Sequence, residues 1–197
     1  MPTYKLFYFD LPGRAEGIRL AFHYAKVPFE DVRIKREEWP GKKSSFKYQQ
    51  IPVLKVDDHE IAQTNAILRY IGRKFGIEGK DEFETARLDE LNELLNEVQM
   101  ALATYPGVAL GFIPGDREQL KQEKLIPAAE KYAPLETGSG YFVKSGPTYL
   151  DFHISEVVQN LARLDPDVWS KYKVLDEHHK RIHALPQLKS YLDAHPH

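Results

Sequence analysis

The first 75 residues alternate between apolar runs typical of strands and stretches with helical periodicity. Residues 3–9 are β-branched and aromatic and predict a buried strand, which Asp10–Gly13 ends as a turn. Apolar residues at helical spacing then predict a helix over residues 14–26, and residues 29–34 alternate as a second strand. A strand, a helix and a strand joined by short loops predict a right-handed βαβ unit with parallel strands.

A hairpin and a further helix follow this unit. Residues 35–48 are charged and irregular, with either no regular structure or a short helix. Two apolar runs, 51–54 and 60–62, flank an acidic turn and predict paired strands. A helical pattern begins at Thr64, which we expect to cap a helix that ends near Gly76. The order predicts a small mixed sheet with helices on its faces.

After Lys80 the strand signal disappears. Residues 83–105 carry apolar side chains in steps of three and four, which predict a long amphipathic helix. Two further helices are predicted over residues 116–132 and 148–163, and residues 166–193 predict two or three shorter ones.

The length of the chain fits two units. A chain of 197 residues suits one large or two small domains. We expect an α/β domain over residues 1–77 and an all-α domain over residues 81–197, with the glycines of residues 76–80 at the boundary.

Composition narrows the chemistry. The chain has no Cys, which excludes disulfides, thiolate metal sites and a cysteine nucleophile. The first 75 residues hold 14 basic and nine acidic side chains, whereas the whole chain has a net charge of −2. This basic front suits a small anionic ligand, but no dense basic run suggests nucleic acid. No apolar run or signal peptide suggests a membrane or secretion, so we expect a cytoplasmic protein.

Candidate chemistry gathers at the end of the first predicted strand. Tyr8 stands there, where α/β folds bind ligands, and its hydroxyl could donate one hydrogen bond. The alternative is that Tyr8 is one more core aromatic. If the βαβ unit forms, Arg14, Trp39 and Lys43 would reach the same edge, where two cations and an indole donor suit carboxylates.

The predicted hairpin adds a second group of candidates. A strand entered through Pro52 would leave the backbone of Val53 free to pair with an extended peptide. Gln63 and Thr64, at a helix N-terminus, would offer backbone N–H groups to a carboxylate. Together these features describe a clamp for a small acidic peptide, and the alternative is an ordinary hairpin and helix.

Two further motifs are expected to be structural. His179 and His183 are one helical turn apart, but no third ligand or His-Glu-x-x-His motif accompanies them, so we expect an exposed helix face and no metal site. Thr148 and Asp151 have the spacing of a capping box, and we expect Asp151 to be buried.

Taken together, these residues resemble the cytosolic glutathione S-transferases, most closely the sigma class. That class includes the haematopoietic-type prostaglandin D synthases and many invertebrate detoxification enzymes. The matching segments lie in order over essentially the whole chain: Tyr4–Phe9, Gly13–Glu16, Glu38–Trp39, Gln50–Leu54, Gln63–Thr64, Ala66–Ile71 and Thr148–Asp151.

The resemblance implies a thioredoxin-like N-terminal domain, an all-helical C-terminal domain and a homodimer. It implies that Tyr8 is the catalytic hydroxyl, that glutathione is a co-substrate, and that no cofactor or metal is needed. Glu97 of the neighbouring subunit would support the site, although the class usually has Asp there. The other glutathione contacts that it implies are Arg14, Trp39, Lys43, Gln50, Ile51, cis-Pro52, Gln63 and Thr64.

The function that we expect is conjugation of glutathione to electrophilic or hydrophobic substrates in detoxification, with prostaglandin-H D-isomerase activity also open. A thioredoxin-type sheet without a Cys-x-x-Cys pair cannot exchange dithiols, so the sulfur must be that of glutathione. The alternative is a non-catalytic carrier of haem or other apolar ligands. The second substrate stays unassigned, because residues 105–114 of its expected pocket are rich in glycine and proline.

Overall fold

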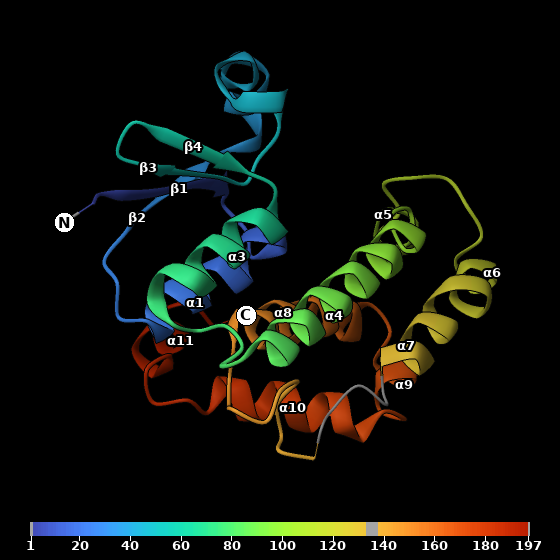
Figure 1. Cartoon of the computed structure of the whole chain (residues 1–197). Helices are drawn as coiled ribbons and strands as arrows, with labels where there is room; N and C mark the ends of the chain where they lie inside the picture. The colour runs from blue at the N-terminus through green and yellow to red at the C-terminus, as the bar shows by residue number, and fades with distance from the viewer. Residues whose placement is uncertain (1, 133–137, 197) are drawn as a thin grey trace.

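The structure, a computed structural model, describes residues 2–132 and 138–196 of the chain. Its first part is a β-sheet with helices packed on it, and the remainder is helical (Figure 1). Among the described residues, no helix combines the length and the apolar character that crossing a membrane requires.

The strands confirm the predicted mixed sheet. β1 (Tyr4–Phe9) pairs in parallel with β2 (Glu30–Ile34) and antiparallel with β3 (Val53–Val56), which in turn pairs antiparallel with β4 (His59–Ala62). The order across the sheet is β2-β1-β3-β4. β1 is therefore a central strand. Its carboxyl-terminal end leads directly into the loop before α1.

Alternate side chains of β1 enter two different cores, as the period of a strand requires. Tyr4, Leu6 and Tyr8 are buried in the larger core, which continues into the helical part. Phe7 points to the other face and packs against a small core that contains Val53 and Phe46.

Helices cover both faces of this sheet. α1 (Glu16–Tyr24) and α3 (Thr64–Phe75) lie together on the face turned towards the helical part (Figure 1). The charged segment that the sequence left irregular consists of short helical turns: η2 (Arg36–Glu38), α2 (Trp39–Lys42), η3 (Lys43–Ser45) and η4 (Lys47–Gln49).

The helical part begins with a long helix that is shorter than predicted. α4 spans Glu82–Ala101, and its buried face carries the expected leucines. A separate helix, α5, spans Tyr105–Ala109 and has Pro106 in its first turn. A proline lacks the backbone N–H and clashes with the carbonyl four residues earlier, so Pro106 prevents α4 from continuing.

The remaining helices surround one central helix. α8 (Tyr149–Leu164) packs against α1 on one side and against α10 on another. The other helices of this part are α6 (Arg117–Leu120), the π-helical η5 (Lys121–Leu125), α7 (Ile126–Tyr132), α9 (Pro166–Trp169), α10 (Lys173–His183) and α11 (Lys189–Ala194). The short turn η1 (Gly13–Ala15) belongs to the sheet part and directly precedes α1.

A continuous apolar core joins the two parts of the chain, from Tyr4 to Tyr191. Gly17 of α1 lies so close to α8 that a Cβ there would be 2.8 Å from the Cα of His153. The apolar core is shared by residues 1–77 and residues 81–197, so the division of the chain into these two domains stays a prediction from the sequence.

The start of α8 confirms the predicted capping box. Thr148 is the N-cap residue, and Asp151 accepts a hydrogen bond from its backbone N–H at 2.8 Å. Asp151 is fully buried, as expected. It also accepts a hydrogen bond from the Phe142 N–H at 3.2 Å and lies 2.9 Å from Nε2 of His178, so it ties α8 to a loop and to α10.

Two local predictions are wrong. The N-cap of α3 is Gln63, with a φ of 74°, and Thr64 is the first helical residue. The hydroxyl of Thr64 instead donates to the carbonyl of Arg14 at 3.3 Å. His179 and His183 do not form an exposed face, because α10 turns them towards α8, where both are half-buried.

Candidate active site

A cleft of about 340 Å³ opens at the carboxyl end of β1. It is formed by the end of that strand, the short helical turns, the start of β3 and the start of α3. Nine residues predicted from the sequence line it: Tyr8, Arg14, Trp39, Lys43, Gln50, Ile51, Pro52, Gln63 and Thr64. The sequence reasoning missed Phe9 and Gln49, which also line the cleft and directly adjoin predicted residues.

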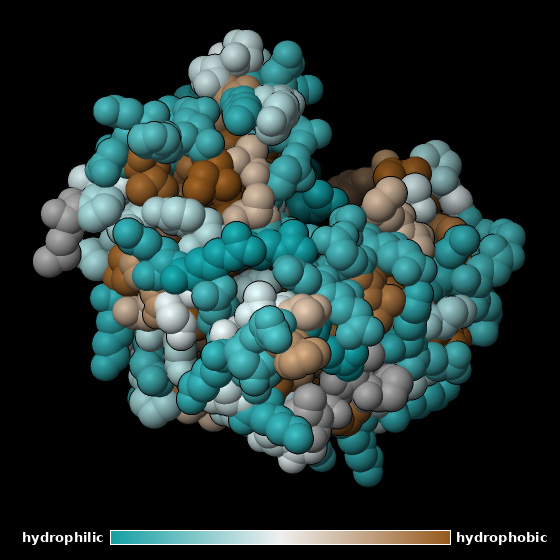
Figure 2. All heavy atoms as spheres, viewed as in Figure 1, coloured by the Kyte–Doolittle hydropathy of each residue, from teal (hydrophilic) through white to brown (hydrophobic). Residues whose placement is uncertain are grey.

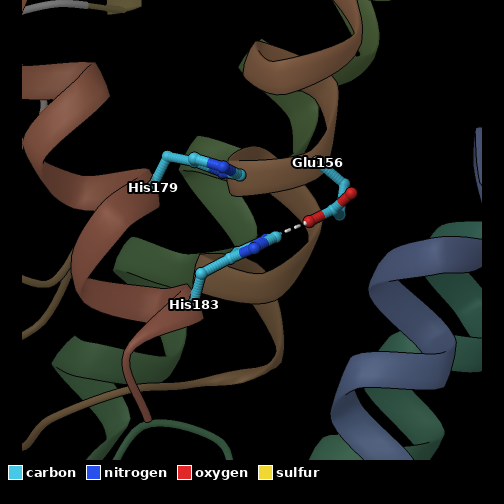
Figure 3. Close-up of side chains that lie close together, drawn as sticks. All are labelled: Glu156, His179 and His183. Atoms are coloured by element: carbon cyan, nitrogen blue, oxygen red, sulfur yellow. Dashed lines mark hydrogen bonds and ion pairs between the residues drawn. The ribbon is translucent and has the colours of Figure 1, made fainter. Parts of the chain in front are cut away.

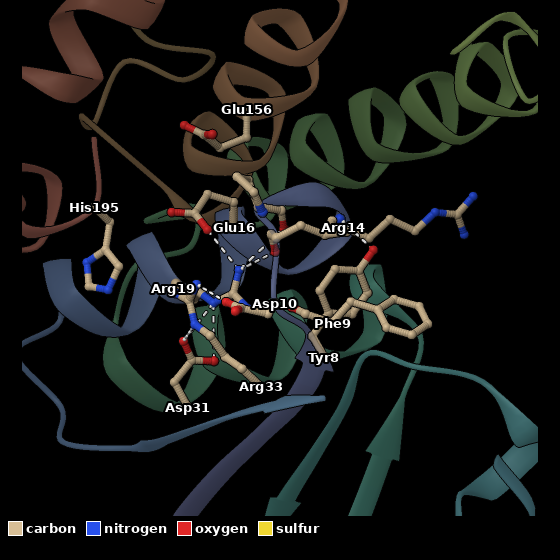
Figure 4. A network of polar contacts seen from close by, with 12 residues as sticks. Tyr8, Phe9, Asp10, Arg14, Glu16, Arg19, Asp31, Arg33, Glu156 and His195 are labelled. Carbon is tan, nitrogen blue, oxygen red and sulfur yellow. Dashed lines mark hydrogen bonds and ion pairs between the residues drawn. The ribbon is translucent and has the colours of Figure 1, made fainter. Parts of the chain in front are cut away.

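The Tyr8 hydroxyl is oriented by the backbone of the loop that follows β1. It accepts a hydrogen bond from the N–H of Arg14 at 3.0 Å. Because that bond uses a lone pair of the hydroxyl oxygen, the phenolic proton is left to be donated into the cleft. Figure 4 shows the tyrosine oxygen next to Arg14, whose guanidinium extends away from the buried charges behind it.

Gly13 makes this approach possible. Its φ of +45° favours glycine, and a Cβ at this position would lie 2.8 Å from the Tyr8 hydroxyl and 2.6 Å from Cδ1 of Leu11. The loop can therefore pass over the tyrosine only because residue 13 has no side chain.

A buried ionic network supports the same loop (Figure 4). The Arg19 guanidinium, which is fully buried, pairs with Glu16 at 2.9 Å and with Asp31 at 3.0 Å. It also donates to the carbonyl of Leu11 at 3.0 Å, and Tyr191 of α11 donates to Glu16 at 2.7 Å. Sequence reasoning missed this network, although Glu16 and Arg19 are one turn apart on a predicted helix.

The hairpin contributes to the cleft in a different way from the one predicted. The Ile51–Pro52 bond is cis, as the resemblance implied. Val53, however, lies in register with Phe7 on one side and Ala62 on the other. It is inside the sheet and not at a free edge, so the expectation that its backbone pairs with a guest peptide is wrong. Ile51 precedes the strand and lines the cleft.

The N-terminus of α3 faces the cleft without a capping side chain. Within the part of the chain that the structure describes, no side chain accepts a hydrogen bond from the N-terminal N–H groups of α3. The side chain of the N-cap residue, Gln63, instead donates through Nε2 to Oε1 of Gln50 at 3.0 Å. Uncapped N–H groups and the positive end of the helix dipole favour a carboxylate. Trp39 completes the opposite wall and packs edge-on against Phe9, with ring centroids 5.6 Å apart.

Glu97 lies outside this cleft. It is on α4, its side chain is 67% exposed, and it forms an ion pair with Lys131 of the same chain at 2.7 Å. Its expected contribution to the site of a neighbouring subunit stays a prediction.

The fold and the site define a class of protein: a thioredoxin-like sheet domain with a helical domain behind it and a ligand cleft at the end of the first strand. The family models of the glutathione S-transferase N-terminal and C-terminal domains match residues 4–73 and 118–195. The chain therefore belongs to the glutathione S-transferase family of enzymes.

Within that family, the similar proteins include several from nematodes. The chain is 38% identical to glutathione S-transferase 1 of Ascaris suum, over 100% of this chain and 98% of that protein. A monomeric glutathione S-transferase of the hookworm Necator americanus has a TM-score of 0.89 and 34% identity, covering 99% of this chain and 98% of that one. Prostaglandin synthase D of Nilaparvata lugens has a TM-score of 0.87 and 29% identity, with both chains covered completely.

Proposed function

We propose that this enzyme conjugates glutathione to electrophilic or hydrophobic substrates, with Tyr8 as the catalytic hydroxyl. The observation that carries the proposal is the 3.0 Å hydrogen bond from the Arg14 N–H to the Tyr8 oxygen. It leaves the tyrosine as a donor at the mouth of the sheet. A thiol with the usual pKa of about 8.5 is mostly protonated at neutral pH, and a donor to the thiolate lowers that pKa.

The rest of the cleft suits the remainder of glutathione, a peptide with two carboxylates. Arg14 and Lys43 offer positive charge, and the N-terminus of α3 offers uncapped N–H groups. Ile51 lines the cleft just before β3, and its backbone is proposed to pair with the middle of the extended peptide. No bound cofactor is needed for this chemistry, because the reacting sulfur arrives with the co-substrate.

The second substrate is proposed to bind beside α5. Leu110, Phe112 and Ile113 follow that helix and are exposed. Figure 2 shows a hollow between the sheet part and α5, with hydrophobic side chains on its α5 side. Exposed apolar side chains next to a cleft favour a hydrophobic ligand. The likeness to an insect prostaglandin synthase supports including prostaglandin H among the substrates to be assayed.

The same exposed side chains favour a second function, that of a carrier for haem or other apolar ligands. A carrier would bind such a ligand with no turnover of chlorodinitrobenzene and glutathione. An enzyme would conjugate the two, and the rate would depend on Tyr8. The two functions are therefore separated by one spectrophotometric assay.

Class and assembly belong to the same proposal: a sigma-class enzyme, cytoplasmic and homodimeric. The basic first part and the acidic remainder are complementary in charge. Tyr48, Phe83 and Met100 are large apolar side chains that the single chain leaves exposed. In a dimer, Glu97 would approach the cleft of the other subunit. One hookworm relative is described as monomeric, so the proposed homodimer needs a direct test. Light scattering at micromolar concentration and moderate salt measures the mass of the protein in solution, and a single species of monomer mass would contradict the homodimer.

The test of the proposed mechanism is Tyr8→Phe, which removes one oxygen and keeps the ring. The pKa of bound glutathione should rise by one to two units, at about 1.4 kcal/mol each, and the conjugation rate at neutral pH should fall roughly ten- to a hundredfold. The deficit should shrink as pH rises, because the thiol then ionises unaided. Glutathione affinity should barely change.

Tyr4→Phe is the matched control, because Tyr4 lies four residues earlier on the same face of β1 and does not line the cleft. Ultraviolet titration of the bound thiolate and the pH dependence of the rate are measured for all three proteins. If Tyr8→Phe leaves the thiolate titration unchanged, the sulfur is activated by Arg14 or by a backbone N–H of the loop Leu11–Gly13.

A further inference from the structure

The packing of α10 on α8 brings together three side chains that the sequence pattern kept apart. His179 and His183 come from one face of α10, and Glu156 comes from α8 opposite them (Figure 3). Glu156 is 2% exposed, and the two histidines are half-buried. The third ligand that the sequence did not reveal is thus supplied by another helix.

The geometry of the three side chains is close to that of a metal site. One ligand atom from each residue lies within 4.8 Å of the others. Nε2 of His183 is 2.7 Å from Oε1 of Glu156. Zinc binds at about 2.0–2.2 Å from nitrogen and oxygen, so tetrahedral ligands are separated by roughly 3.3 Å. Small side-chain rotations would therefore bring all three atoms to an ion.

A neighbouring hydroxyl orients one of the imidazoles. Nδ1 of His179 is 2.8 Å from Oγ of Ser155, the residue before Glu156. With Nδ1 donating its proton to that oxygen, the lone pair of Nε2 is left for a ligand. Metal-binding histidines almost always have their second ring nitrogen held in this way.

The donor set selects the kind of ion. Two imidazoles and one carboxylate suit zinc and similar divalent transition metals, whereas magnesium and calcium prefer oxygen ligands alone. A buried carboxylate also needs a cation near it, because burial without one is costly. His179 additionally lines a cavity of about 280 Å³ with Val158 and Trp169, which gives water a route to an open coordination position.

We propose that Glu156, His179 and His183 form a binding site for a divalent transition metal such as zinc, which joins α8 to α10. None of the three residues lines the cleft at Tyr8. The proposed metal site can therefore be tested independently of the proposed glutathione chemistry. The competing explanation is an ion pair between His183 and Glu156 that needs no metal.

The test is calorimetric titration of the chelator-treated, desalted full-length protein with zinc chloride. We expect one zinc ion per chain and no binding of magnesium. Glu156→Gln, His179→Gln and His183→Gln should each weaken binding at least tenfold. Ser155→Ala, which removes only the orienting hydroxyl, should weaken it by about tenfold, within the range measured for such outer contacts.

His59→Gln is the control, since His59 is an exposed histidine on β4 and lies outside the cluster. It should bind zinc as the wild type does. Circular dichroism checks that each variant is folded, and His179→Gln decides the question if loss of the buried Glu156 prevents folding. Absence of stoichiometric zinc binding to the wild type at micromolar concentrations overturns the proposal. Binding that is equally tight in the cluster variants overturns it too and leaves the ion pair as the explanation.

Discussion

Replacement of Asp151 by alanine should be one of the most destabilising single changes in this chain. The buried carboxylate accepts hydrogen bonds from the backbone N–H groups of Thr148 and Phe142 and from the Thr148 hydroxyl, and it lies 2.9 Å from Nε2 of His178. Alanine removes the acceptor and leaves these donors behind. The start of α8, the loop at Phe142 and α10 would all lose a common partner.

The magnitude follows from the donors left unpaired. A buried donor without an acceptor costs about 1–3 kcal/mol, and the loss of a helix cap typically costs about 0.5–2 kcal/mol. The Thr148 N–H is the cap contact, and the Phe142 N–H is one further buried donor, so together they predict a loss of roughly 1.5–5 kcal/mol for Asp151→Ala. In a chain of this size, 1 kcal/mol shifts the melting temperature by about 2–4 °C, so the shift should be at least about 3 °C. Asp151→Asn keeps one acceptor oxygen and should lose less.

Urea unfolding and calorimetry measure this loss, with Asp193→Ala as the control. Asp193 is an exposed carboxylate on α11 that pairs with Lys189, and exposed pairs contribute at most about 1 kcal/mol. Glutathione affinity of the folded fraction should be unchanged in Asp151→Ala, because Asp151 does not line the cleft. A variant with the thermal stability of the wild type would refute the reasoning and show that other acceptors replace the carboxylate.

Two further predictions concern His153 and Gly13. Burial, and then the positive charge of Arg14, lower the pKa of His153 from 6.5 to about 4. As pH falls from 6.5 to 4, His153 is therefore protonated in the unfolded chain but still neutral in the folded protein. The folded protein loses roughly 3 kcal/mol of stability over that pH range. His153→Gln should flatten this dependence in urea unfolding at pH 7, 6 and 5, and an unchanged slope would contradict the assignment. Gly13→Ala should displace the Tyr8 hydroxyl and lower the conjugation rate roughly ten- to a hundredfold. Gly41→Ala, where a Cβ meets nothing within 4 Å, should leave the rate unchanged, and equal rates in both variants would refute the argument.

The parts of the fold that the sequence predicts well are those set by local periodicity. The alternation along β1 places Tyr4, Leu6 and Tyr8 on one face, and the structure buries all three together. The end of α4 was predicted too late, although Pro106 marks it physically. The N-cap of α3 could not be predicted locally, because the hydroxyl of Thr64 is engaged by a carbonyl 50 residues earlier in the chain.

The candidate site divides in the same way. Tyr8 and its neighbours Arg14, Trp39 and Lys43 were reachable from the predicted βαβ unit. Pro52, Gln63 and Thr64 followed from the predicted hairpin and helix start, whereas Gln50 and Ile51 were named only through the resemblance to a known family. The ionic network around Arg19 of α1 depends on Asp31 of β2, and no local pattern indicates this partner. Glu156 and His183 are 27 residues apart, and their pairing depends on the relative rotation of α8 and α10, which the periodicity within each helix does not determine.

The hydrogen bond from Tyr191 to Glu16 joins residues that are 175 positions apart, and this has a consequence for synthesis on the ribosome. At about 5–20 residues per second, Glu16 is made roughly 9–35 seconds before Tyr191. The face of α1 that packs on α8 stays uncovered until α8 is made, and the Glu16 carboxylate lacks its Tyr191 donor until α11 follows. We therefore expect the nascent sheet part to need a chaperone until the helical part has left the ribosome.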